Sequence, residues 1–176
     1  MGIRAIEQKI EELTSKRVLQ FETVSGGSIS QAYIANLSGG VKLFTKISDH
    51  ESDMFQKEAK GLATLSQVGK VRTPEVLFHD ESCLVMEYIP SNSKNDRFFR
   101  SLAESLATLH QQTSKTIGFE EDNFIGTTAQ KNTPELEGKE KQWADFFIQY
   151  RLDFQFNLAK EQGKLQEEIL SLYKEL

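Results

Sequence analysis

The sequence predicts an α+β fold in which five antiparallel strands and one inserted helix come first and a mainly helical part follows. Two observations lead to this prediction. In the first half of the chain, short segments rich in apolar and β-branched residues are separated by glycine pairs and polar turns, as expected for strands. After residue 95 the apolar residues recur instead at every third or fourth position, which is the period of a helix that buries one face.

Composition and charge exclude several classes of protein. The chain has 176 residues, of which 38% are hydrophobic, and this is enough for a packed core. Its net charge of −5 argues against a general nucleic-acid surface, because phosphate backbones are bound through clustered Lys and Arg. No apolar run approaches the ~20 residues of a membrane-spanning helix, and the first residues lack the apolar core of a signal peptide. We therefore expect a cytoplasmic protein that binds neither nucleic acid nor a membrane.

The few cysteine and histidine residues predict no metal site. One Cys and three His are scattered along the sequence, whereas a structural zinc site needs about four such ligands close together. Cys83 lies in an apolar run, so we expect a buried and inert thiol.

The first three strands are expected after a short amphipathic helix. Apolar side chains at helical spacing mark this helix at Ile3, Ile6, Ile10 and Leu13. Strand patterns follow at residues 18–24, 31–37 and 41–47. Gly39 and Gly40 form the kind of pair that a tight hairpin turn needs. Side chains alternate between the two faces of a strand, so Phe44 and Lys46 are predicted to share one face of the third strand.

A helix and two further strands complete the predicted sheet. The helix is marked by Met54, Phe55, Glu58, Ala59, Leu62 and Leu65. Strand patterns follow at residues 75–79 and 83–89. Residues 90–95 are polar and indicate a linker, so we place the boundary between a domain of residues 1–90 and one of residues 91–176 there.

The second domain is predicted to be helical apart from one long connection. Helical spacing of apolar residues is found at residues 99–109, 143–158 and 165–176. Residues 118–138 are irregular and longer than a typical connection of about 4–6 residues, and such loops are usually functional or disordered.

A glycine-rich turn between the first two strands is a candidate phosphate-binding segment. It consists of Gly26, Gly27, Ser28, Ile29 and Ser30. Without a Cβ at the glycines, backbone N–H groups can approach phosphate oxygens, and the serine hydroxyls add donors. Alone the turn is weak support, because most such turns only connect two strands. It also lacks the Gly-Lys-Ser/Thr of a Walker loop and the helix start of a Rossmann turn.

Lys46 and Glu58 carry the strongest functional signal. Lys46 shares a strand face with Phe44, although an edge lysine can also cover apolar surface with its stem. Glu58 lies on the apolar side of its helix, where an unpaired carboxylate is unfavourable and needs a partner. In kinases, a Lys–Glu pair between the third strand and the next helix orients the lysine toward the ATP phosphates. These features together predict a protein-kinase-like nucleotide-binding lobe.

The end of the last predicted strand is a candidate adenine site. Glu87, Tyr88 and Ile89 stand directly before the linker. In kinase-like lobes the adenine edge pairs with main-chain groups at this crossing, so the carbonyl of Glu87 and the N–H of Ile89 are the candidates. The alternative is a core strand that simply continues into a linker.

Several segments together resemble one kinase family. The earlier ones are shared with aminoglycoside and choline kinases and comprise residues 26–33, 44–46, 54–59 and 84–88. The more specific ones are Gly118-Phe119 with residues 122–126, Gln130 and Asn132, and then residues 143–147 with Arg151 and Leu152. On these two later segments, the sequence resembles the fructosamine kinase (ketosamine kinase) family over about residues 5–165.

The resemblance implies ATP-dependent phosphorylation of a ketosamine, on a protein or a free amine. Lys46 would orient the phosphates and Glu58 would position Lys46, while the glycine-rich turn covers the phosphates. Mg²⁺ would accompany ATP. Asn123, Gly126 and Arg151 would lie on the substrate side, although Asn123 and Gly126 also suit a simple turn and Arg151 a solvated helix position.

The sequence also departs from the family. Members continue into a His-Gly-Asp-Leu-Trp loop with a following Asn and a Mg²⁺-binding Asp, and this sequence reaches Leu176 without them. We therefore expect a truncated kinase-like fold that lacks its metal ligands, is inactive alone, and offers its last helix to a partner surface. Two alternatives stay open: a non-catalytic nucleotide-binding module, and a small-molecule kinase of the aminoglycoside or choline type.

Overall fold

The computed structural model describes residues 2–25, 30–49, 52–69, 71–133, 143–165 and 167–173. The chain divides into two compact units, Met1–Thr113 and Ser114–Leu176. The predicted boundary at residue 90 concerns the lobes of a kinase and stays a prediction, because the division into compact units falls after the helix that follows the linker.

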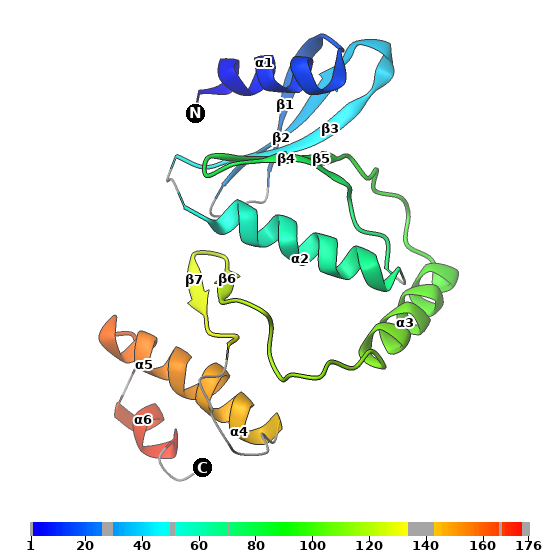
Figure 1. Cartoon of the computed structure of the whole chain (residues 1–176). Helices are drawn as coiled ribbons and strands as arrows, with labels where there is room; N and C mark the ends of the chain where they lie inside the picture. Colours follow the sequence, from blue (N-terminus) through cyan, green and yellow to red (C-terminus); the bar gives the residue numbers. More distant parts are fainter. Residues whose placement is uncertain are drawn as a thin grey trace. The chain divides into compact units, whose positions relative to one another are not determined.

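The first unit is built on one antiparallel sheet of five strands, as predicted (Figure 1). The strands are β1 (Val18–Val24), β2 (Gln31–Leu37), β3 (Lys42–Ile47), β4 (Val76–His79) and β5 (Cys83–Glu87). Their order in the sheet is β1-β2-β3-β5-β4. Strand β5 ends two residues earlier than expected, at Glu87, whose N–H donates to the carbonyl of Glu75 at 2.8 Å.

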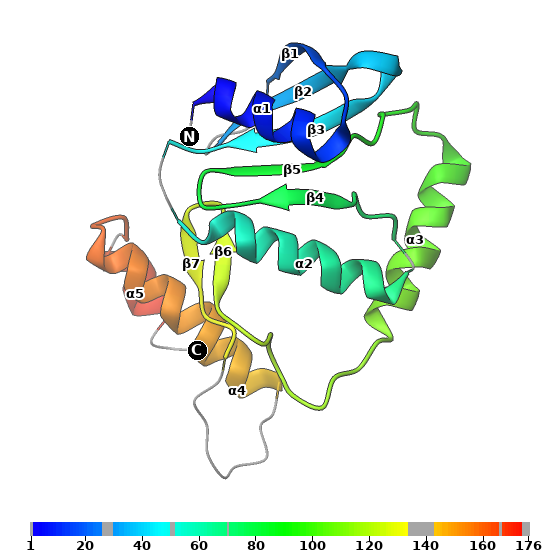
Figure 2. The same cartoon turned by 45° about the horizontal axis from the view of Figure 1, so that its top comes forward.

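Two helices cover the opposite faces of this sheet (Figures 1 and 2). Helix α1 (Ile3–Thr14) buries Ile6 and Ile10 against one face, together with Leu43 and Ile47 of β3. Helix α2 (Met54–Val68) lies between β3 and β4 in the sequence and packs on the other face. Its buried side chains join a cluster with partly buried Phe44: Phe55, Ala59, Leu84 and Met86.

The alternation predicted for β3 is confirmed. Leu43, Thr45 and Ile47 are buried, whereas Phe44 and Lys46 are half-buried on the side of α2. The central strand β3 thus presents Lys46 at the face of the sheet where α2 packs. This placement is what brings Lys46 within reach of the helix.

The turn between β2 and β3 depends on its glycines. Gly39 and Gly40 have φ angles of +77° and +75°, a region that L-residues with a Cβ rarely adopt. The prediction of a tight turn at this pair is confirmed.

One helix of the first unit exposes its apolar stripe. Helix α3 (Asp96–His110) begins at Asn95, whose Oδ1 accepts a hydrogen bond from the N–H of Phe98 at 2.9 Å. Four large apolar side chains of α3 are exposed: Phe98, Phe99, Leu102 and Leu106. Among the described helices, α3 included, none combines the length and the apolar character that crossing a membrane requires.

The second unit combines a small hairpin with consecutive helices. The hairpin strands are β6 (Asn123–Ile125) and β7 (Thr128–Gln130). Then come α4 (Trp143–Phe147), a π-helix (Ile148–Asp153), α5 (Phe154–Glu161) and α6 (Glu167–Tyr173). The expectation of an irregular segment at 118–138 was wrong for residues 123–125 and 128–130, and residues 134–138 lie outside the described residues. Strands of three residues are too short to show the alternation that marks a strand in sequence.

Candidate functional site

Lys46 and Glu58 form the predicted ion pair between β3 and α2. The distance from Lys46 Nζ to Glu58 Oε1 is 2.6 Å, and 29% and 32% of their side chains are exposed. The pair follows from the local sequence. Period-2 alternation turns Lys46 toward α2, and Glu58 stands beside buried Ala59 on the helix face that packs on the sheet. The predicted geometry is therefore confirmed, and the catalytic role stays a prediction.

This arrangement leaves Lys46 able to bind an anion. An ammonium group has three N–H donors, and the bond to Glu58 takes one of them. Because the Lys46 and Glu58 side chains are partly exposed, a ligand can reach the ammonium group of Lys46 from solvent. The carboxylate holds the lysine in one direction and balances its charge, so Lys46 can hold a phosphate oxygen with its remaining donors.

The strand register places the two strand ends that flank the predicted glycine-rich segment at the same end of the sheet as Lys46. Lys46 lies directly opposite Ala32 of β2, and Ala32 in turn pairs with Val24 of β1. The connection between these two strands carries the predicted phosphate segment. Its last residue, Ser30, is described and half-buried at the start of β2. Gly26, Gly27, Ser28 and Ile29 lie outside the described residues.

The predicted adenine segment begins where β5 leaves the sheet. Glu87 pairs with Leu43 of β3, three positions along the strand from Lys46, which corresponds to about 10 Å at the usual rise of a strand. The Glu87 carboxylate forms an ion pair with Arg72. Tyr88 has Lys42 Nζ 5.9 Å from its ring centroid, and Ile89 is partly exposed. Their contact with adenine stays a prediction.

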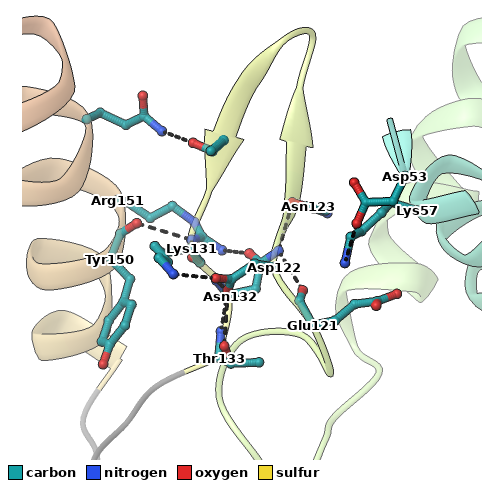
Figure 3. A network of polar contacts seen from close by, with 12 residues as sticks. Asp53, Lys57, Glu121, Asp122, Asn123, Lys131, Asn132, Thr133, Tyr150 and Arg151 are labelled. Atoms are coloured by element: carbon teal, nitrogen blue, oxygen red, sulfur yellow. Dashed lines mark hydrogen bonds and ion pairs between the residues drawn. The ribbon is translucent and has the colours of Figure 1, made fainter. Parts of the chain in front are cut away.

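The second unit contains a network of polar contacts centred on the ends of its hairpin (Figure 3). Asp122 Oδ1 accepts hydrogen bonds from the backbone N–H groups of Asn132 at 2.8 Å and Thr133 at 3.2 Å. Asp122 Oδ2 lies 2.7 Å from Lys131 Nζ. Burial alone would raise the pKa of Asp122, but these donors hold that pKa well below its usual range.

Asn132 is the most deeply buried member of this network, with 2% of its surface exposed. Its Nδ2 donates to the carbonyl of Glu121 at 3.1 Å and to Asn123 Oδ1 at 2.7 Å. Its Oδ1 accepts from Arg151 Nη2 at 2.6 Å. Asn132 therefore connects two of the predicted substrate-side residues.

Arg151 projects from the π-helix and bonds to the hairpin. Its guanidinium donates to the carbonyl of Lys131, to the carbonyl of Tyr150 at 3.3 Å and to Asn132. It also stacks 4.8 Å from the ring centroid of Phe146. Burial lowers the pKa of Arg151 and the nearby Asp122 opposes that shift. A substrate contact by Arg151 stays a prediction, and the contacts seen here hold the hairpin.

Comparison with known proteins gives the family. A model of the fructosamine kinase family matches residues 3–176. This chain belongs to the fructosamine kinase family. Its fold is accordingly that of the protein-kinase-like enzymes, and the recognition made from the later sequence segments is confirmed.

Named relatives and solved structures of the fructosamine kinase family agree. The chain is 34% identical over 168 residues to a "probable ketoamine kinase" of Synechocystis sp., covering 91% of the chain and 55% of that protein. A "probable ketoamine kinase" of Vibrio parahaemolyticus is 31% identical over 170 residues, with coverage of 91% and 57%. A crystal structure assigned as a fructosamine-3-kinase of Thermobifida fusca matches with a TM-score of 0.74 and 25% identity, covering 94% of this chain and 57% of that one. The chain thus spans about half the length of the curated relatives it matches.

Sequence reasoning identified most of these residues but not how they are joined. Asn123 and Arg151 are joined through Asn132, whereas Gly126 stands apart at the hairpin turn with a φ angle of +66°. The central position of Asn132 was not predicted. Asn132 belongs to a segment that resembles the family, but a buried amide in a polar segment produces no apolar periodicity, so its burial was not indicated.

Proposed function

We propose that this chain provides the nucleotide-binding part of a cytoplasmic, ATP-dependent kinase that phosphorylates ketosamines. The ion pair between Lys46 and Glu58 is the observation that carries the proposal. It joins the third strand to the next helix at 2.6 Å, in the position where kinases hold the lysine that contacts the α- and β-phosphates.

The proposed nucleotide contacts follow the order of the sheet. Lys46 binds phosphate oxygens with the donors that Glu58 does not use. The turn from Gly26 to Ser30 covers the phosphates with backbone N–H groups, and Glu87 to Ile89 bind the adenine edge through main-chain groups. Mg²⁺ is bound together with the phosphates and neutralises their charge. No residue of this chain is proposed as a ligand of Mg²⁺.

The proposed acceptor is the sugar part of a ketosamine. The chain's family and its named relatives support this class of substrate. Asn123, Gly126 and Arg151 are proposed to lie on the substrate side, where Asn123 offers hydrogen bonds and Arg151 keeps the hairpin in place. We assign none of these residues as the base that takes the proton from the attacking hydroxyl.

ATP binding by the purified chain tests the nucleotide part of the proposal. Lys46→Ala removes the phosphate donor, and we expect the Kd for ATP to rise at least about tenfold, as for loss of a charge-assisted hydrogen bond. Lys9→Ala is the control, because Lys9 belongs to α1 on the opposite face of the sheet. Equal affinities of wild type and Lys46→Ala for ATP, measured by calorimetry, would contradict the proposal.

Substrate preference tests the ketosamine part. For the complete kinase, of which this chain is proposed to be a part, we expect kcat/KM for fructosyl-lysine to exceed that for kanamycin and for choline in the same enzyme preparation. A site that hydrogen-bonds sugar hydroxyls rejects analogues that lack them by up to ~10⁴-fold. A preference for kanamycin or choline would contradict the assignment. ATP binding by the complete protein without turnover of any of the three would favour a non-catalytic nucleotide-binding module.

A further inference from the structure

Three residues of the second unit form hydrogen bonds that all run in one direction. Arg151 donates to Asn132 Oδ1 at 2.6 Å, and Asn132 Nδ2 donates to Asn123 Oδ1 at 2.7 Å (Figure 3). A guanidinium group has donors only, so Asn132 must turn its oxygen toward Arg151. Its NH₂ group then faces Asn123, which must turn its own oxygen inward. The charge of Arg151 thereby decides how the Asn123 amide is oriented.

The orientation of Asn132 is strongly constrained. Its second amide hydrogen bond goes to the carbonyl of Glu121 at 3.1 Å, and its backbone oxygen accepts from the N–H of Phe119 at 3.2 Å. A flipped amide would place NH₂ against the donors of Arg151 and oxygen against two acceptors. In a side chain that is 2% exposed, such unpaired groups are unfavourable because water cannot replace the lost partners.

Asn123 is left with an unused donor group. Its oxygen is occupied by Asn132, and its Nδ2 has no hydrogen-bond partner among the residues that the structure describes. The side chain is half-buried rather than enclosed. Asn123 therefore presents two N–H donors in a fixed direction, while its oxygen is turned toward Asn132.

We propose that Asn132 is a positioning residue that fixes Asn123 as a hydrogen-bond donor, and that this donor binds an oxygen of the ketosamine sugar. The inference rests on the proposed function and specifies the polarity of its substrate site. Sugar hydroxyl, carbonyl and ring oxygens all accept hydrogen bonds, whereas the protonated amine of a ketosamine only donates. The fixed NH₂ group of Asn123 thus selects the sugar end of the substrate and repels the amine end.

The helix that carries Arg151 supports a positioning role. Arg151 lies within the π-helix Ile148–Asp153, a geometry that is rare in proteins and frequent at functional sites. A second contact from these helices to the hairpin, from Gln155 Nε2 to the carbonyl of Ala129 at 3.0 Å, lies outside the directional series. Gln155 therefore offers a matched control that loosens the hairpin without altering the orientation of Asn123.

Exchange of side-chain amide protons with water, measured by NMR on the whole chain, tests the orientation directly. We expect slow exchange for the Asn132 NH₂ group and fast exchange for the Asn123 NH₂ group. In Asn132→Asp the new carboxylate still accepts from Arg151 but offers no donor to Asn123. The Asn123 amide should then turn, donate to the carboxylate and exchange more slowly, whereas Gln155→Ala should leave its exchange fast. Protected Asn123 protons in the wild type would overturn the proposal.

Fructosyl-lysine binding, measured by calorimetry, tests the role of the donor. Asn123→Asp keeps an acceptor for Asn132 and removes the donors, so the melting temperature should stay while affinity falls about tenfold. Gln155→Ala should change affinity less than about twofold, since it removes one neutral contact away from the ligand. Undiminished binding by Asn123→Asp would overturn the proposal. If the wild type binds no fructosyl-lysine while the exchange pattern holds, the substrate assignment of the proposed function fails and the positioning by Asn132 stands.

Discussion

The two units of the chain are stabilised by different kinds of contact. The first unit buries apolar side chains on both faces of its sheet, with Ile6 and Ile10 on one side and Phe55 and Leu84 on the other. In the second unit the hairpin is instead held by hydrogen bonds that converge on buried Asn132. Apolar contacts are non-directional, whereas a buried hydrogen bond is lost when one partner is replaced.

The two candidate sites therefore differ in the contacts that hold their side chains in place. The Lys46–Glu58 pair is partly exposed and lies beside an apolar core, so the core and not the pair stabilises its surroundings. Asn123 depends on a series of individual polar groups that are themselves structural. Polar substitutions should therefore leave the first unit folded and disrupt the second.

The largest effect is expected at Gly118 in the second unit. A Cβ there would stand 2.0 Å from the backbone oxygen of Asn132 and 3.1 Å from Phe146, at a φ angle of +93°. We expect Gly118→Ala to destabilise this unit by more than about 3 kcal/mol, because backbone must move. Gly163→Ala is the control, since its φ is +65° but its Cβ would meet open space, and it should cost about 1 kcal/mol.

Hydrogen exchange followed by mass spectrometry distinguishes the two units in these variants. Gly118→Ala should remove protection from the hairpin peptides and leave that of the sheet strands unchanged. Loss of protection in both units together would show that they unfold as one, and the comparison between them would fail.

The second prediction concerns the apolar core. Phe55 is 1% exposed on α2, and Phe55→Ala should destabilise the first unit by about 3–5 kcal/mol through lost burial and a cavity. Leu19→Ala, at a side chain that is 62% exposed, should change stability by no more than about 0.5 kcal/mol. Urea denaturation monitored on the sheet measures both. A small effect of Phe55→Ala would mean that polar contacts also stabilise this unit.

The third prediction is a pH dependence of the second unit. Hydrogen bonds and Lys131 lower the folded-state pKa of Asp122 below its unfolded value, which is about 4. The folded state therefore favours the ionised carboxylate. Its stabilisation is complete above the unfolded pKa and is lost as pH falls toward the folded pKa. The melting temperature of the hairpin should drop below about pH 4, and Asp122→Asn should remove that part of the drop. An unchanged acid profile in Asp122→Asn would contradict this.

The smallest effect on stability is expected at the ion pair. Glu58→Gln removes the charge of a partly exposed pair, so stability should change by no more than about 1 kcal/mol. Affinity for ATP should nevertheless fall, because Lys46 is no longer held in one direction. Chemical denaturation and ATP titration of the same preparation measure the two effects. A large loss of stability with unchanged ATP affinity would show that the pair stabilises the fold and does not position Lys46 for ATP.

The sheet could be predicted from sequence because its signals are local. Strand alternation and the Gly39-Gly40 turn each follow from backbone geometry over a few residues. The β6–β7 hairpin could not be predicted in this way, since its strands have only three residues each.

The candidate site was predictable where a residue violated its local pattern. Glu58 is a carboxylate on an apolar helix face, and the violation required a partner, which is Lys46. Asn132 violates nothing in a polar segment, and only the folded chain shows that it is buried. The sequence allowed two roles for Arg151, a solvated helix position or a contact with a ligand. The structure shows a third role that was not predicted, because Arg151 forms hydrogen bonds to the end of the hairpin.

Labelling with an acyl phosphate of ATP tests the central claim most directly. When this reagent binds as ATP does, a lysine amine near the phosphates attacks its acyl carbon and releases ATP, leaving an acylated lysine. Mass spectrometry of peptides from the labelled chain then identifies the residue. We predict acylation at Lys46 that excess ATP suppresses and that Glu58→Gln weakens. Labelling of Lys46 that ATP does not suppress, or ATP-sensitive labelling only at other lysines, would contradict the assignment of Lys46 to the phosphates.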